Sequence, residues 1–132
     1  MVMEKRLLIA DDNVDFANLC AKVAHGEGWT VTLCKDGAEL LEAIRRDDLP
    51  ALVLCDVNMP EVDAFAVING LRDTKRRLLF RFMTGGAPIN ATAASLLAEE
   101  LGLSVRGYLP KPIGIDSLRA TLALDVEALS AL

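Results

Sequence analysis

The sequence is poor in the residues that build zinc centres and disulfide frameworks. It contains three cysteines and one histidine in 132 residues. The cysteines, Cys20, Cys34 and Cys55, are odd in number and lack the close pairing that a zinc site or a redox motif requires. We therefore expect three reduced thiols, mostly buried as small residues.

A long apolar run is also missing. No stretch approaches the roughly 20 consecutive apolar residues of a membrane helix, and the apolar run after Arg6 is too short for a signal peptide. A cytoplasmic protein with no membrane partner is the expectation. The chain has no internal repeat, low-complexity segment or linker, so residues 1–132 are expected to form one domain.

Positive charge is in the minority. Fourteen Lys and Arg stand against nineteen Asp and Glu, and the formal net charge of −5 argues against direct nucleic acid binding. The basic cluster at Lys75, Arg76 and Arg77 is expected to be a solvated loop, because long charged side chains are mostly exposed.

Apolar strand patterns alternate with helical patterns along the chain. Strands are expected at Arg6–Ala10, Thr30–Cys34, Ala51–Asp56, Leu78–Met83 and Val105–Leu109, and helices at about residues 14–25, 38–44, 65–71, 88–101 and 115–129. The last helix should begin with Asp116 or Ser117 near its N-cap. This alternation predicts an α/β fold, a doubly wound five-stranded parallel sheet with five helices.

The third of these strands is the centre of the prediction. Its apolar run ends at Asp56, and Pro60 should stop regular structure soon afterwards because proline disfavours the helical conformation of the preceding residue. Side chains alternate along a strand, so Cys55 should point to the face opposite Asp56.

Polar residues follow the other strands at the same ends. They are Asp11 and Asp12 after the first strand, Thr84 after the fourth and Lys111 after the fifth. In parallel α/β sheets, ligands bind at the carboxyl ends of the strands. The second strand supplies no comparable group and suits a sheet edge.

These side chains define a chemistry. Two carboxylates about 4 Å apart repel by roughly 4 kcal/mol at an effective dielectric constant of 20, so Lys111 and a hard cation such as Mg²⁺ are needed to offset Asp11, Asp12 and Asp56. A carboxylate beside Mg²⁺, a lysine and a hydroxyl can attack phosphorus and form an aspartyl phosphate. No glycine-rich phosphate loop of the Walker type is present, so ATP is not the expected donor.

Four motifs carry a resemblance to a known family. Residues 9–13 (IADDN), 56–60 (DVNMP), 83–85 (MTG) and 108–112 (YLPKP) resemble the receiver domain of two-component response regulators, in order and spacing, over essentially the whole chain. The resemblance implies the strand order 2-1-3-4-5. It also implies a signalling domain that catalyses only its own phosphorylation and dephosphorylation.

The resemblance assigns roles to single residues. Asp56 would accept phosphate from a histidine kinase or a histidine phosphotransfer protein. Mg²⁺ would be held by Asp12, Asp56 and the backbone carbonyl of Asn58, with Asp11 acting through water. Lys111 would contact a phosphoryl oxygen, and its peptide bond to Pro112 would be cis.

The resemblance also implies a switch. Thr84 and Tyr108 would respond to phosphorylation and alter a surface formed by the fourth helix, the fifth strand and the fifth helix. A downstream output domain or protein would bind this surface, and a second copy of the chain is a further candidate partner.

Other interpretations stay open at this stage. A phosphatase with an aspartyl phosphate intermediate commonly has a second acid two residues after the nucleophile, whereas Asn58 occupies that position here. A degenerate receiver could act only as an interaction module. Thr84 could merely begin a turn with Gly85 and Gly86, and Tyr108 could be a static core aromatic.

Overall fold

The computed structural model of the protein describes residues 4–59 and 62–132. Pro60, which was expected to end the regular structure after Asp56, lies outside these residues. The strands are β1 (Arg6–Ala10), β2 (Thr30–Cys34), β3 (Ala51–Asp56), β4 (Leu78–Thr84), β5 (Ser104–Val105) and β6 (Leu109–Pro110). The helices are α1 (Val14–Gly26), α2 (Gly37–Arg45), α3 (Ala64–Gly70), α4 (Pro88–Glu100) and α5 (Ile115–Ser130). Within the described residues, no helix is long and apolar enough to cross a membrane.

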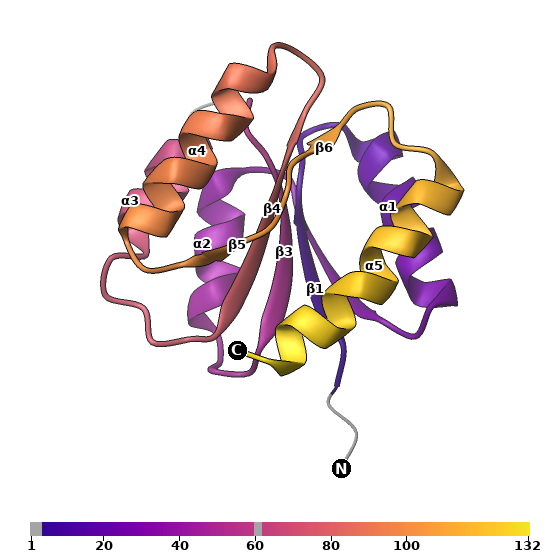
Figure 1. The fold of residues 1–132 in the computed structure, drawn as a ribbon, viewed down its shortest axis with the longest axis horizontal. Helices are drawn as coiled ribbons and strands as arrows, with labels where there is room; N and C mark the ends of the chain where they lie inside the picture. The colour runs from indigo at the N-terminus through magenta and orange to yellow at the C-terminus, as the bar shows by residue number, and fades with distance from the viewer. Residues whose placement is uncertain (1–3, 60–61) are drawn as a thin grey trace.

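The strands form one parallel sheet in the order β2-β1-β3-β4-β5, with β6 also paired to β4. Helices α1 and α5 cover one face of the sheet, and α2, α3 and α4 cover the other (Figure 1). This arrangement confirms the doubly wound α/β fold, and the position of β2 at the edge was also expected.

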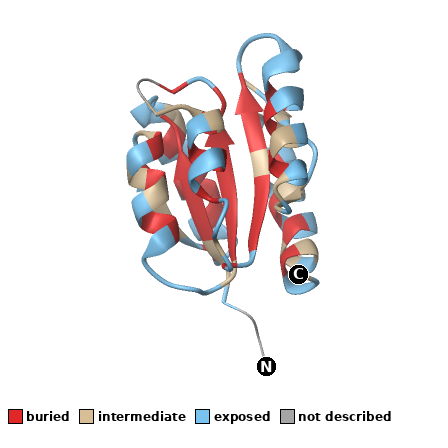
Figure 2. Cartoon of the chain, turned by 90° about the vertical axis from the view of Figure 1, so that its left-hand side faces the viewer, coloured by how far each residue is buried: buried red, intermediate tan, exposed pale blue. Residues whose placement is uncertain are grey.

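The inner strands β1, β3 and β4 are mostly buried on both faces, as Figure 2 shows for the sheet between its two helical layers, whereas the edge strand β2 is partly exposed. In β3, Val53 and Cys55 enter the core beneath α2, α3 and α4, whereas Leu52 and Leu54 enter the core beneath α1 and α5. The three cysteines are free and buried, as predicted. Burial raises the pKa of the Cys20 thiol to about 11 and that of Cys34 to about 12, so both stay protonated near neutral pH.

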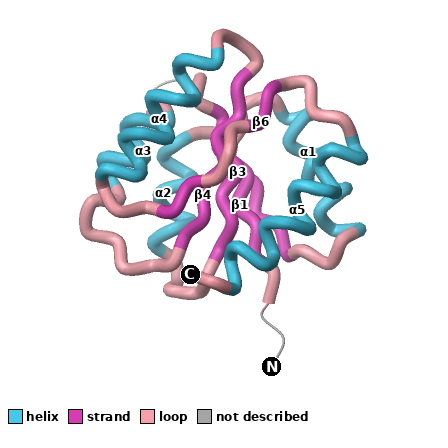
Figure 3. The backbone as a smooth tube through the Cα atoms, viewed as in Figure 1, coloured by secondary structure: helices cyan, strands magenta, loops and turns pink. Residues whose placement is uncertain are grey.

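The expected fifth strand at Val105–Leu109 is wrong as a continuous element. Two short pairings replace it, and a stretch of loop separates β5 from β6 (Figure 3). The register changes between them: Phe80 on β4 pairs with Val105 and Met83 pairs with Leu109, so three residue steps on β4 face four on the other segment. One extra residue therefore interrupts the pairing, as in a β-bulge. In this interruption the guanidinium of Arg81 donates to the carbonyl of Gly107 at 2.7 Å.

The prediction that the basic cluster Lys75–Arg77 is solvated is wrong for Arg76. This residue is only 6% exposed. Its guanidinium donates to the carbonyls of Ala43, Ile44 and Leu49 at 3.1, 2.9 and 2.6 Å. Arg76 thus binds carbonyls at the end of α2, where the last carbonyls of a helix lack regular intrahelical partners; that of Ala43 also accepts from the Arg46 N–H at 3.3 Å.

Helix α5 begins at Ile115, as expected. Its N-cap is Gly114, which makes no side-chain capping hydrogen bond, so Asp116 lies near the N-cap, in the first turn, but does not cap the helix. The buried face contains Asp125, which is 1% exposed, beside Leu122. An acid at such a position requires a partner, and Arg81 on β4 supplies it.

Candidate functional site

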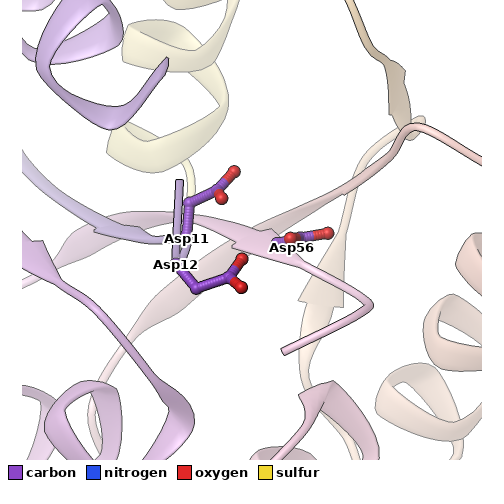
Figure 4. A group of neighbouring side chains, drawn as sticks. All are labelled: Asp11, Asp12 and Asp56. Carbon is purple, nitrogen blue, oxygen red and sulfur yellow. The ribbon is translucent and has the colours of Figure 1, made fainter. Parts of the chain in front are cut away.

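The predicted site residues lie together at the carboxyl ends of the strands. Asp11 and Asp12 follow β1, Asp56 ends β3 and Thr84 ends β4. Ligand oxygens of Asp11, Asp12 and Asp56 all lie within 4.8 Å of one another (Figure 4). Asp11 and Asp56 are buried, whereas Asp12 is exposed, so the group of acids opens to solvent on one side.

Local backbone geometry fixes one oxygen of each buried acid. The backbone N–H of Asn13 donates to Oδ1 of Asp11 at 2.9 Å, and that of Asn58 donates to Oδ1 of Asp56 at 3.2 Å. Each acid thus uses Oδ1 for the residue two positions later in the sequence. The Oδ2 atoms of both acids are left to face Lys111.

Lys111 lies between these two oxygens. Its backbone N–H donates to the carbonyl of Thr84 at 2.8 Å, which holds the residue beside the end of β4. Its Nζ lies 2.5 Å from Oδ2 of Asp11 and 3.4 Å from Oδ2 of Asp56. The peptide bond between Lys111 and Pro112 is cis, as the resemblance implied.

The pKa values in this group reflect burial and mutual charge. Burial raises the pKa of the Asp56 carboxyl; the Asn58 N–H and Lys111 oppose this change, and Asp11 adds to it. Burial alone would lower the pKa of the Lys111 ammonium, but its contacts with Asp11 and Asp56 hold that pKa above its ordinary value. The ammonium is therefore charged at neutral pH.

The site has more negative than positive charge. Among the described residues, three carboxylates meet one ammonium. Oδ2 of Asp11 is buried and has no aligned hydrogen-bond donor in the part of the chain that the structure describes, apart from its ion-pair contact with Lys111. A set of only oxygen ligands with surplus negative charge fits a hard divalent cation such as Mg²⁺.

Comparison with known proteins gives the family. Residues 7–123 match the family described as the response regulator receiver domain. The chain belongs to this family.

Solved structures agree on the fold of the receiver. A CheY-like receiver domain protein from Methanospirillum hungatei JF-1 has a TM-score of 0.82 at 20% identity, covering 97% of this chain and 98% of that one. NtrX from Brucella abortus has a TM-score of 0.80 at 23% identity, covering 98% of this chain and 28% of that one.

The curated relatives are longer proteins. The response regulator MprA of Mycobacterium ulcerans (strain Agy99) is 34% identical over 120 residues, which are 91% of this chain and 49% of that protein. The transcriptional regulatory protein ZraR of Escherichia coli (strain K12) is 29% identical over 116 residues, 88% of this chain and 25% of that protein. The receiver thus spans about a quarter to a half of these relatives.

The two expected switch residues of the receiver lie in different environments. Thr84 is 2% exposed, and its hydroxyl oxygen accepts a hydrogen bond from the Gly86 N–H at 3.1 Å. Tyr108 is 38% exposed. Tyr108 therefore does not lie in the core, and whether it moves on phosphorylation stays a prediction.

One contact in the site was not expected from the sequence. The Nζ of Lys111 lies over the ring of Phe16 in α1, 4.7 Å from its centroid. Phe16 lies in the first turn of α1, shortly after Asp11 and Asp12. This position was the available signal, since that turn must lie beside the acids.

Proposed function

We propose that this receiver accepts a phosphoryl group on Asp56 from a histidine kinase or a histidine phosphotransfer protein, in a Mg²⁺-dependent reaction. The supporting observation is the grouping of Asp11, Asp12 and Asp56 at one site, where the ammonium of Lys111 pairs with Asp11 and Asp56. A carboxylate oxygen of Asp56 forms the new bond to phosphorus. The bond from phosphorus to the donor imidazole breaks, and the imidazole keeps its electron pair and takes a proton.

Each residue of the site has a part in this reaction. Asp12 and Asp56, with the backbone carbonyl of Asn58, would hold Mg²⁺, with Asp11 acting through water; when bound, the cation offsets charge on the phosphoryl oxygens. The ammonium of Lys111 turns from Asp11 to a phosphoryl oxygen and neutralises its charge. The Thr84 hydroxyl, whose oxygen accepts from the Gly86 N–H, turns to donate its own O–H to a phosphoryl oxygen.

The same proposal covers the output. Residues 1–132 act as one signalling unit that catalyses only its own phosphorylation and dephosphorylation. The movement of Thr84 is coupled to Tyr108, which leaves its exposed position. This movement alters the surface formed by α4, β5 and α5, which signals to a downstream output domain or protein.

The proposal is tested by phosphate uptake from acetyl phosphate. Intact mass and Phos-tag electrophoresis should show one added phosphate on the wild-type protein when Mg²⁺ is present and none when EDTA removes it. Asp56→Asn should take up none, because an amide cannot form the acyl phosphate. Asp73→Asn, an exposed acid between α3 and β4, is the matched control and should behave as wild type.

Two results would contradict the proposal. Absence of uptake by the wild-type protein would indicate an interaction module, especially if a partner bound the wild type and Asp56→Ala equally with and without phosphodonor. Multiple turnover of a phosphate ester would instead indicate a phosphatase.

A further inference from the structure

We propose that Phe16 is a positioning residue for Lys111: its ring face confines the ammonium to the space above Asp11 and Asp56. This inference rests on the proposed function for its effect on phosphorylation, but the contact itself can be tested without phosphate. The Nζ of Lys111 lies 4.7 Å from the ring centroid, within the distance of about 6 Å at which a cation is attracted to an aromatic face.

Backbone hydrogen bonds hold both partners of this contact. The N–H of Phe16 donates to the Oδ1 of Asn13 at 3.0 Å, which caps α1 and places Phe16 in its first turn. The ring is partly buried against the core beneath α1 and α5. Lys111 is fixed at its backbone by the carbonyl of Thr84. The two side chains therefore meet because of the fold and not by chance mobility of a surface lysine.

The ring supplies what the acids alone do not. A lysine side chain has a flexible four-carbon stem, and ordering it during the reaction opposes catalysis. The contact with a ring face is less directional than a hydrogen bond. The ammonium of Lys111 can therefore move from Asp11 toward a phosphoryl group on Asp56 while it stays over Phe16. Because the ammonium is already confined before the reaction, less conformational entropy is lost on reaching the transition state.

The contact is tested first by NMR spectroscopy on the unphosphorylated protein without Mg²⁺. The ε-methylene resonances of Lys111 should be shifted upfield by the ring current of Phe16. Phe16→Leu should remove this shift, and Phe16→Tyr should keep it. Phe65→Leu removes a half-buried ring on the opposite face of the sheet and should leave the Lys111 resonances unchanged. Identical Lys111 resonances in the wild type and Phe16→Leu would overturn the proposal.

The effect on the reaction is tested by initial rates with acetyl phosphate and Mg²⁺. Phe16→Leu should lower the rate about threefold to tenfold, the factor carried by a cation–π contact of ordinary strength. Phe16→Tyr should restore it. In a Lys111→Ala background, Phe16→Leu should have no further effect, because the residue through which it acts is gone. Circular dichroism establishes that each variant is folded.

The outcomes separate this inference from the proposed function. An unchanged or faster rate in Phe16→Leu, or an equal loss in the Lys111→Ala background, would overturn the positioning role. If the wild-type protein takes up no phosphate, the proposed function fails, and the Lys111 resonances alone decide whether Phe16 confines the ammonium.

Discussion

Two groups of buried charges differ in their balance. On β4 and α5, one guanidinium meets one carboxylate: Arg81 Nε and Nη2 donate to the two oxygens of Asp125 at 2.6 and 2.8 Å, and Nη1 donates to the Gly107 carbonyl. At the carboxyl ends of the strands, the ammonium of Lys111 pairs with the buried Asp11 and Asp56, and the exposed Asp12 adds a third carboxylate. The first group is balanced by the chain itself. The second has surplus negative charge, which a bound cation could offset.

Breaking the balanced pair should have the largest effect on stability. In Arg81→Met the carboxylate of Asp125, which is 1% exposed, would stay buried without its partner. Loss of one member of a buried pair costs about 3–5 kcal/mol, so the free energy of unfolding in urea should fall by that amount. Arg81→Met with Asp125→Leu should recover most of the loss, because no uncompensated charge remains.

The control for this prediction is an exposed pair on the same helix. Arg119 lies 3.5 Å from Asp116, and both side chains are largely exposed. Arg119→Met should leave the urea unfolding curve within experimental error. If Arg119→Met and Arg81→Met had equal effects, burial would not be what distinguishes the Arg81–Asp125 pair.

Arg76 is a second buried guanidinium whose hydrogen bonds the chain itself supplies. Its replacement should have the second-largest effect on stability. Arg76→Met would leave the carbonyls of Ala43, Ile44 and Leu49 without this donor, and the free energy of unfolding should fall by about 2–4 kcal/mol. Urea unfolding measures the change. Its neighbour Arg77 is exposed, and Arg77→Met should have no comparable effect. Equal stability of the two variants would contradict the role given to Arg76.

Relieving the unbalanced site should stabilise the fold. Without Mg²⁺ near neutral pH, Asp56→Asn removes a carboxylate whose pKa is raised by burial and by Asp11. The free energy of unfolding should rise by about 1–2 kcal/mol, as is common when a functional group is replaced. Asp73→Asn is the control. A loss of stability in Asp56→Asn would show that the acids are not in conflict.

The pH dependence of this gain has a definite sign. Because the folded pKa of Asp56 is higher than the unfolded one, the native state binds this proton more tightly, and the contribution of Asp56 to stability falls as pH rises. The advantage of Asp56→Asn should be absent below the ordinary carboxyl pKa of about 4. It should grow as pH rises through the folded pKa and then level off. Urea unfolding across this range measures it.

Much of the fold could be predicted because the alternation of apolar strands and helices is strong. The continuous strand at Val105–Leu109 was wrong because this segment has one more residue than β4 between the two pairings, which an apolar pattern does not reveal. The sequence did carry a signal for the buried Arg81–Asp125 pair. Arg81 interrupts an apolar strand, and Asp125 lies at helical spacing between Leu122 and Leu129, so each charge occupied a core position. That Arg81 and Asp125 pair with each other could not be predicted, because it depends on how α5 is positioned along the sheet.

The acids and Lys111 of the site could be predicted because parallel strands bring their carboxyl ends to one edge. Phe16 could not, since its contact depends on the side-chain path of a lysine far away in the sequence. The prediction that Arg76 is exposed was wrong. Long charged side chains are usually exposed, but Arg76 is buried because folding brings it to the carbonyls of α2.

The central claim is that Asp56 receives the phosphoryl group. After incubation with acetyl phosphate and Mg²⁺, borohydride reduction converts an aspartyl phosphate to homoserine, which peptide mass spectrometry locates. We expect homoserine at position 56 alone, in a yield that follows phosphate uptake. Homoserine at position 11 or 12, or phosphate uptake with no homoserine at 56, would contradict the account.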